Sequence, residues 1–84
     1  LHEFGHFLDW TLGFPAEHEQ LFSAEAAAAP LRDYAKTNAR EYFADCFDYW
    51  VKYAENANAI SLLQECAPMT YRYMEDLMRI ANRL

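Results

Sequence analysis

The sequence has few of the residues and patterns on which several classes of protein depend. Valine and isoleucine are almost absent, and no stretch alternates between apolar and polar residues, so nothing predicts a β-strand. No uninterrupted apolar run is long enough to cross a membrane. Lysine and arginine number 7 against 13 acidic residues, and the resulting formal net charge of -6 argues against a nucleic-acid-binding surface.

Cysteine is scarce as well. The two cysteines, Cys46 and Cys66, show no C-x-x-C spacing, so the sequence has no sign of a thiolate zinc site. Two lone cysteines are usually buried and act as small apolar side chains, but a disulfide between them is also compatible with the sequence.

The residues that are present favour helices throughout. Hydrophobic residues make up 54% of the 84 residues, which is enough to enclose one modest core. Gly13 and Pro15 form a helix stop, and Pro68 suits the first turn of a last helix. We therefore predict an all-α chain with helices over residues 1–12, 16–29, 38–57, 58–66 and 68–82.

The most informative motif is HEFGH at the start of the chain. In a helix, residues four apart share one face, so His2 and His6 present two imidazoles side by side, as a tetrahedral zinc ion requires. Glu3 lies about 100° further round the helix, where it could reach a water molecule without being a ligand. The pattern H-E-x-x-H thus predicts two zinc ligands and a general base. The alternative is an amphipathic helix with two surface histidines.

A catalytic zinc site needs a third protein ligand. The extended pattern H-E-x-x-H-x-x-G-x-x-H fails, because Asp9 and Leu12 stand where it requires glycine and histidine. Glu41 is the other candidate, with Asp45 one turn later on the same helix. Periodicity alone also permits a solvated acidic face, or a capping box between Asn38 and Glu41.

Three blocks together resemble the C-terminal catalytic part of the anthrax lethal factor-like zinc metallopeptidases, and the Pro-Pro endopeptidases are similar. The blocks are HEFGH, YAKTNAREYFAD and APMTYRYMEDL, and their order and spacing match across nearly the whole chain. HEFGH is shared by many zincins, whereas the block Tyr-x6-Glu-Tyr-Phe-Ala-Asp, in which six residues separate Tyr34 from Glu41, is more specific. One departure is Asp45, which is shorter than the glutamate of lethal factor itself, although other glutamate-zincins use aspartate.

The resemblance implies a zinc endopeptidase that acts on peptide or protein substrates. Zinc would be bound by His2, His6 and Glu41, with Glu3 as the general base. Tyr34 would donate its hydroxyl to the oxyanion, and Asp45 would accept the second ring N–H of a zinc-binding histidine. The resemblance alone also suggests secretion.

Residues 1–84 would then be a partial catalytic domain. Because HEFGH stands at the first residues and no initial Met is present, we expect the chain to be the C-terminal part of a longer protein. In the fold that it resembles, a small sheet precedes the HExxH helix and its edge strand holds the substrate. This segment is missing here, so we expect a weak enzyme. The alternative function is a non-catalytic helical module that binds a partner through an aromatic-rich surface.

Four further residues carry weaker expectations. Gly5 costs helix stability and would make sense where the two ligand helices pack closely. His18 is expected to be exposed, and Asp9 to be a solvated helix charge. Arg32 could steady a carboxylate or a substrate, but nothing in the sequence requires it.

Overall fold

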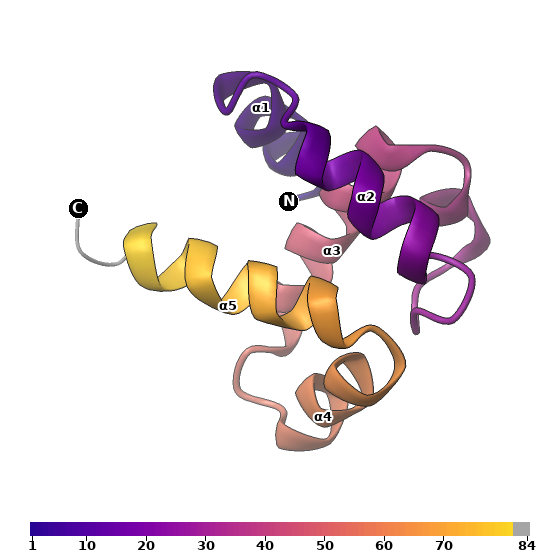
Figure 1. Ribbon diagram of the computed structural model, residues 1–84. Coiled ribbons are helices and arrows are strands. Elements are labelled where there is room, and N and C mark those ends of the chain that lie inside the picture. The colour runs from indigo at the N-terminus through magenta and orange to yellow at the C-terminus, as the bar shows by residue number, and fades with distance from the viewer. Residues whose placement is uncertain (82–84) are drawn as a thin grey trace.

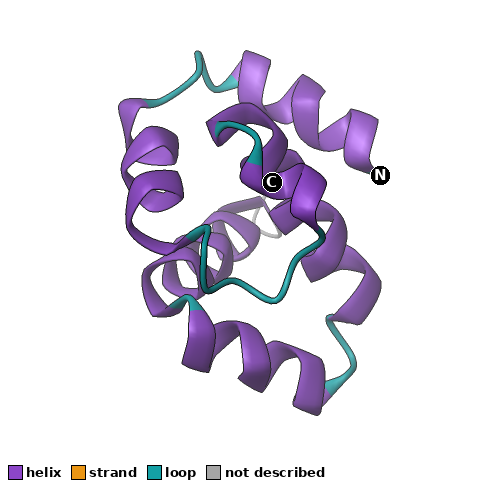
Figure 2. Ribbon diagram, turned by 90° about the vertical axis from the view of Figure 1, so that its right-hand side faces the viewer, coloured by secondary structure: helices purple, strands orange, loops and turns teal. Residues whose placement is uncertain are grey.

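The computed structural model describes residues 1–81, and within them it contains helices and loops but no strand (Figure 2). The predicted all-α class is therefore confirmed. The elements are α1 (His2–Thr11), α2 (Ala16–Glu25), the 3-10 helix η1 (Asp33–Lys36), α3 (Ala39–Tyr53), α4 (Ala57–Cys66) and α5 (Pro68–Ala81).

Helix α3 lies at the centre of the molecule and packs against every other helical element (Figure 1). Its first half is buried on nearly all sides, as Tyr42, Phe43, Cys46 and Phe47 show. The side chains from the other elements that complete the core are Leu21, Ala26, Ala29, Ala35, Leu63, Ala67 and Met74. A single helix therefore connects the hydrophobic core with the predicted metal ligand Glu41.

Helix α1 lies close against α3 because Gly5 has no side chain. A Cβ built on Gly5 would lie 2.8 Å from the Cα atom of Ala44 and 2.9 Å from its carbonyl oxygen. Atoms do not approach so closely without a shift of one backbone. The expected close packing of α1 against α3 at Gly5 is thus confirmed.

Two helices end earlier than the sequence predicts. Helix α2 ends at Glu25 rather than at residue 29, because the next residues turn to place Ala26 and Ala29 in the core, and Pro30 disfavours a helical residue before it. Helix α3 ends at Tyr53 rather than at residue 57, because Asn56 takes a non-helical conformation and caps α4.

The remaining helix ends agree closely with the prediction. Gly13 adopts a φ of 82° after α1, the left-handed conformation typical of a helix stop. Helix α4 begins at Ala57, one position before the predicted start, and α5 begins at Pro68. Residue 82, the predicted end of the last helix, lies outside the described residues.

The structure also bears on two features that the sequence analysis considered, a membrane-spanning segment and a disulfide bond. Within residues 1–81, no helix is long and apolar enough to cross a membrane. Both cysteines are free thiols, with Cys46 buried and Cys66 partly buried, so the disulfide alternative is wrong.

Candidate metal centre

Helices α1 and α3 bring His2, His6 and Glu41 together. The Nε2 atoms of the two histidines are 3.1 Å apart, and Glu41 Oε1 lies 3.0 Å from His2 Nε2 and 2.6 Å from His6 Nε2. Among the described residues, these three form the one group of histidine, cysteine and acidic side chains close enough to share a metal ion. All three are partly exposed, so an ion and a substrate could reach them from solvent.

The protonation of His2 follows from its partner on the other side of the ring. His2 Nδ1 lies within hydrogen-bond distance of Asp45 Oδ1, and an ionised carboxylate can only accept, so Nδ1 carries the proton. In the neutral His2 ring, Nε2 then carries no proton, and its lone pair faces the carboxylate of Glu41. Two lone pairs at 3.0 Å repel each other unless a cation lies between them. The site is therefore arranged to receive a proton or a metal ion.

The donor set fits zinc. Two imidazole nitrogens and one carboxylate oxygen are the ligands of a common class of catalytic zinc site, which leaves one position open. Metal–ligand bonds of about 2.0–2.1 Å imply separations of about 3.3 Å between tetrahedral ligands. The observed separations of 2.6–3.1 Å are somewhat shorter, so small side-chain movements would accommodate the ion.

Glu41 is placed by the start of α3. The side chain of Asn38 accepts the backbone N–H of Glu41 at 2.9 Å, which is one half of the predicted capping box. The Glu41 side chain does not complete the box but points to the histidines. Burial by itself would raise the pKa of Glu41, but the hydrogen bonds from Tyr34 and His6 outweigh it and lower the pKa below its ordinary value. Glu41 is thus kept ionised, as a ligand must be.

Tyr34 lies at the edge of the site, on η1. Its hydroxyl donates to Glu41 Oε2 at 2.8 Å, and its ring centroid is 5.9 Å from that of His2. This hydrogen bond is the main reason that the pKa of Tyr34 is raised, and the charge of Glu3 adds a smaller contribution. Glu3 is exposed in the first turn of α1, directly after His2.

Asp45 is almost completely buried, with 5% of its side chain exposed. Its carboxylate accepts from His2 and also from Arg32, whose Nε donates to Oδ2 at 2.7 Å and whose second terminal nitrogen donates to Oδ1 at 3.0 Å. Burial would raise the pKa of Asp45, but the bonds from Arg32 and His2 lower it. The expected contact between Asp45 and a site histidine is present in the structure.

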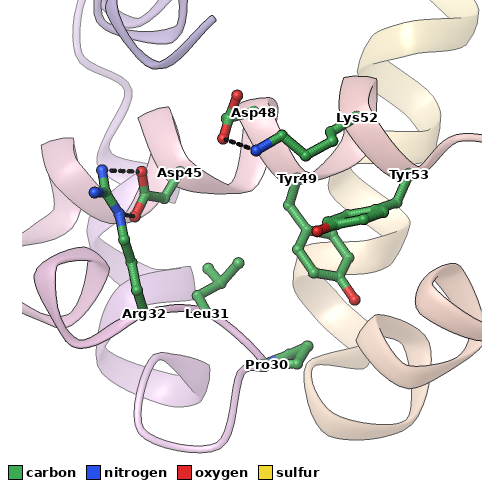
Figure 3. A pocket seen from close by; sticks show the side chains of 8 residues that line it. All are labelled: Pro30, Leu31, Arg32, Asp45, Asp48, Tyr49, Lys52 and Tyr53. Carbon is green, nitrogen blue, oxygen red and sulfur yellow. Dashed lines mark hydrogen bonds and ion pairs between the residues drawn. The ribbon is translucent and has the colours of Figure 1, made fainter.

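Arg32 is a residue near the site for which no definite role was predicted from the sequence. Its guanidinium group reaches Asp45 from the loop before η1, which is an interaction between segments that no local pattern predicts. The one signal in the sequence was its position two residues before Tyr34. Figure 3 shows the pair at one side of a pocket of about 230 Å³ between the 30–32 segment and α3.

The expectations for Asp9 and His18 are wrong. Both side chains are buried, at 2% and 4% exposure, rather than solvated. His18 Nδ1 donates to Asp9 Oδ1 at 2.8 Å, while the Tyr73 hydroxyl lies 2.6 Å from His18 Nε2. The polar atoms are all satisfied inside the protein, which makes burial possible, and neither residue joins the metal-ligand group.

Comparison with known proteins supplies one match. The sequence profile of the family described as "Anthrax toxin lethal factor, N- and C-terminal domain" matches residues 1–77. No curated protein matches the chain significantly. No solved structure matches it significantly either.

Proposed function

The chain belongs to the anthrax toxin lethal factor family, N- and C-terminal domain, and from this premise we propose that it is part of the catalytic domain of a zinc-dependent endopeptidase. The observation that carries the proposal is the convergence of three atoms that could bind a metal, one of which is the bare Nε2 of His2, whose other ring nitrogen is bonded to the buried Asp45. A histidine oriented by a carboxylate is the usual arrangement behind a metal ligand in proteins.

Zinc would be held by His2, His6 and Glu41. When bound, the ion would supply Lewis-acid chemistry toward the carbonyl group of a peptide bond. The protein contributes the geometry: α1 and α3 are locked together at Gly5, so the ligands from the two helices stay in register. The partial exposure of all three ligands leaves one side of the site open to a substrate.

Two further side chains would take part in hydrolysis. Glu3 follows His2 directly and is exposed, so its carboxylate can accept a proton from the attacking water and deliver it to the leaving amine. Tyr34 can turn its hydroxyl from Glu41 toward the negative charge that develops on the peptide oxygen. These are the roles that peptide hydrolysis requires beyond metal binding.

A second candidate function rests on the outer face of α1. Phe4, Phe7 and Trp10 follow one another on this face and are 53%, 56% and 63% exposed. Neighbouring rings are about 6 Å apart, at 6.1 Å and 5.9 Å between centroids. Apolar side chains gathered in this way often mark a surface that another protein segment covers. A helical module that binds a partner through this face is the alternative to an enzyme.

Zinc analysis and peptide cleavage separate the two candidates. The metal content of the purified protein is compared with that of His6→Ala and Glu41→Gln, and cleavage of a peptide library is compared with that of Glu3→Gln. We expect one zinc per wild-type chain, loss of zinc in the two ligand variants, and an activity loss of about a hundredfold in Glu3→Gln with zinc retained.

Glu65→Gln is the matched control, because Glu65 is an exposed glutamate on α4. It should leave both zinc and activity unchanged. Equal zinc in the wild type and both ligand variants would exclude the metal site, and near-normal turnover by Glu3→Gln would exclude the base role. Partner binding that depends on Phe4, Phe7 and Trp10 but not on Glu3, without any cleavage, would support the helical module.

A further inference from the structure

We propose that Arg32 is a positioning residue of this site: it holds Asp45 in the orientation that fixes His2, and it steadies Tyr34 at the same time. The inference rests on the proposed metal centre, but its structural part concerns only the protein's own side chains. The proposed roles as metal ligand, general base and oxyanion donor do not include Arg32.

The first step is the geometry of the ion pair. Two nitrogens of the Arg32 guanidinium group donate to the two different oxygens of Asp45, at 2.7 and 3.0 Å (Figure 3). Such a two-point contact fixes the plane of a carboxylate, whereas a single contact would leave it free to rotate. Asp45 is 5% exposed and Arg32 is 61% exposed, so a cation at the surface orients a buried anion.

The second step connects this pair to His2. Oδ1 of Asp45 accepts from both Arg32 and His2, so the carboxylate cannot rotate about its Cβ–Cγ bond without breaking both bonds. While Oδ1 stays in place, the proton of His2 stays on Nδ1 and the lone pair of Nε2 points at Glu41. Removal of Arg32 would free the carboxylate to turn and would weaken the preference of His2 for this tautomer.

The third step connects Arg32 to Tyr34. The guanidinium carbon lies 5.0 Å from the centre of the Tyr34 ring, within the range of a cation–π contact. Arg32 is the residue that precedes η1, and Tyr34 is inside it. One side chain therefore ties the η1 segment to α3 at the point where Tyr34 enters the site.

A simple stabilising ion pair is the alternative explanation. An exposed arginine contributes little to stability, and a lysine could replace its charge. Positioning requires the planar fork of arginine, because an ammonium group is a point charge that cannot hold two oxygens in one plane. Arg32→Lys thus separates the two explanations, and Arg32→Gln removes the charge as well.

The test uses the protein in two states. In metal-free protein, ¹⁵N NMR of the His2 ring reports which nitrogen carries the proton. In the presence of zinc, a competition titration reports affinity. Arg72→Gln is the matched control, because Arg72 is also exposed and pairs with an aspartate, Asp76, away from the site.

We expect Arg32→Gln and Arg32→Lys to give a mixture of His2 tautomers and about a tenfold loss of zinc affinity, while Arg72→Gln changes neither. Full recovery of both readouts by Arg32→Lys, or wild-type readouts in both variants, would overturn the proposal. If wild-type protein binds no zinc, the proposed function fails, but the tautomer measurement still confirms or overturns the role of Arg32.

Discussion

Within residues 1–81, two histidine–aspartate pairs differ in which group faces the second ring nitrogen of the histidine. In both, a histidine donates Nδ1–H to an aspartate on another helix: His2 to Asp45, and His18 to Asp9. The Nε2 atom of His18 meets the hydroxyl of Tyr73, whereas that of His2 faces the candidate metal ligands His6 and Glu41.

The rings of His18 and His2 also differ in how deeply they are buried. The His18 ring is buried and stacks on Phe43 at 4.0 Å with an angle of 11° between the planes. The His2 side chain remains 20% exposed beside Glu41. A histidine–aspartate contact alone therefore does not identify a functional site. The role depends on whether the free nitrogen is satisfied by the protein or left for a ligand.

The largest expected difference between the pairs is in stability. His18→Ala would leave Asp9 buried without its partner and should lower the free energy of unfolding by about 3–5 kcal/mol. His2→Ala should change it by less than about 1 kcal/mol in zinc-free buffer, because Asp45 keeps its bond to Arg32. Urea unfolding followed by circular dichroism measures both values. Equal losses would mean that the His2 pair is also structural.

Substitution of the two aspartates, Asp45 and Asp9, should have different effects on zinc affinity. Asp45→Asn places an amide N–H₂ group against the donors of His2 or Arg32, so zinc affinity should fall about 10- to 100-fold. Asp9→Asn should lower stability but leave the zinc affinity of the folded protein unchanged. Competition titration with a zinc chelator measures the affinities. A comparable fall in both variants would contradict the division into two kinds of pair.

The two glycines, Gly5 and Gly13, allow a test of the close packing of α1 against α3. This packing brings the His2–Asp45 pair next to Glu41, whereas the His18–Asp9 pair has no such neighbour among the candidate ligands. Gly5→Ala forces a Cβ against the Ala44 backbone and should cost about 1–3 kcal/mol of stability, with weaker zinc binding because α1 and α3 move apart. Gly13→Ala is the control, since its positive φ strains an alanine by about 1–2 kcal/mol but nothing lies near its Cβ. Zinc binding should survive Gly13→Ala. Unchanged zinc affinity in Gly5→Ala would show that close helix packing is not needed for the site.

The smallest expected effect concerns the tyrosine beside each pair. Tyr73→Phe removes the hydroxyl that meets His18 and should cost about 1 kcal/mol, whereas the exposed Tyr34→Phe should cost less than about 0.5 kcal/mol. Tyr34→Phe should instead lower peptidase activity.

The contribution of the Tyr73 hydroxyl to stability should also depend on pH in the alkaline range. Burial, with smaller contributions from Glu17 and Asp9, raises the pKa of Tyr73 from 10.0 to about 12. The stability that depends on neutral Tyr73 is therefore fully present below pH 10 and is lost as the pH rises toward about 12. Tyr73→Phe should show a shallower loss over this interval in urea unfolding. Identical pH profiles for the wild type and Tyr73→Phe would contradict the burial of this hydroxyl.

Features that depend on neighbours along the chain could be predicted from the residues. His2 and His6 share a face because they are four apart in a helix, and Asn38 caps α3 because its side chain reaches the N–H three residues later. The stop at Gly13 and the absence of strands within residues 1–81 follow from equally local preferences. Such interactions span a few residues, so their outcome changes little with the rest of the fold.

Other features required the packed molecule. Glu41 and Asp45 have the same spacing on α3 whether they face water or a cleft, and only the contact with α1 makes Glu41 a partner of the histidines. His18 and Asp9 are polar residues of types usually found at the surface, yet they are buried and hydrogen-bonded to each other. Arg32 meets Asp45 only because a loop folds back on α3. Residue type and periodicity describe one segment at a time, whereas burial and hydrogen-bond partners depend on which segments meet.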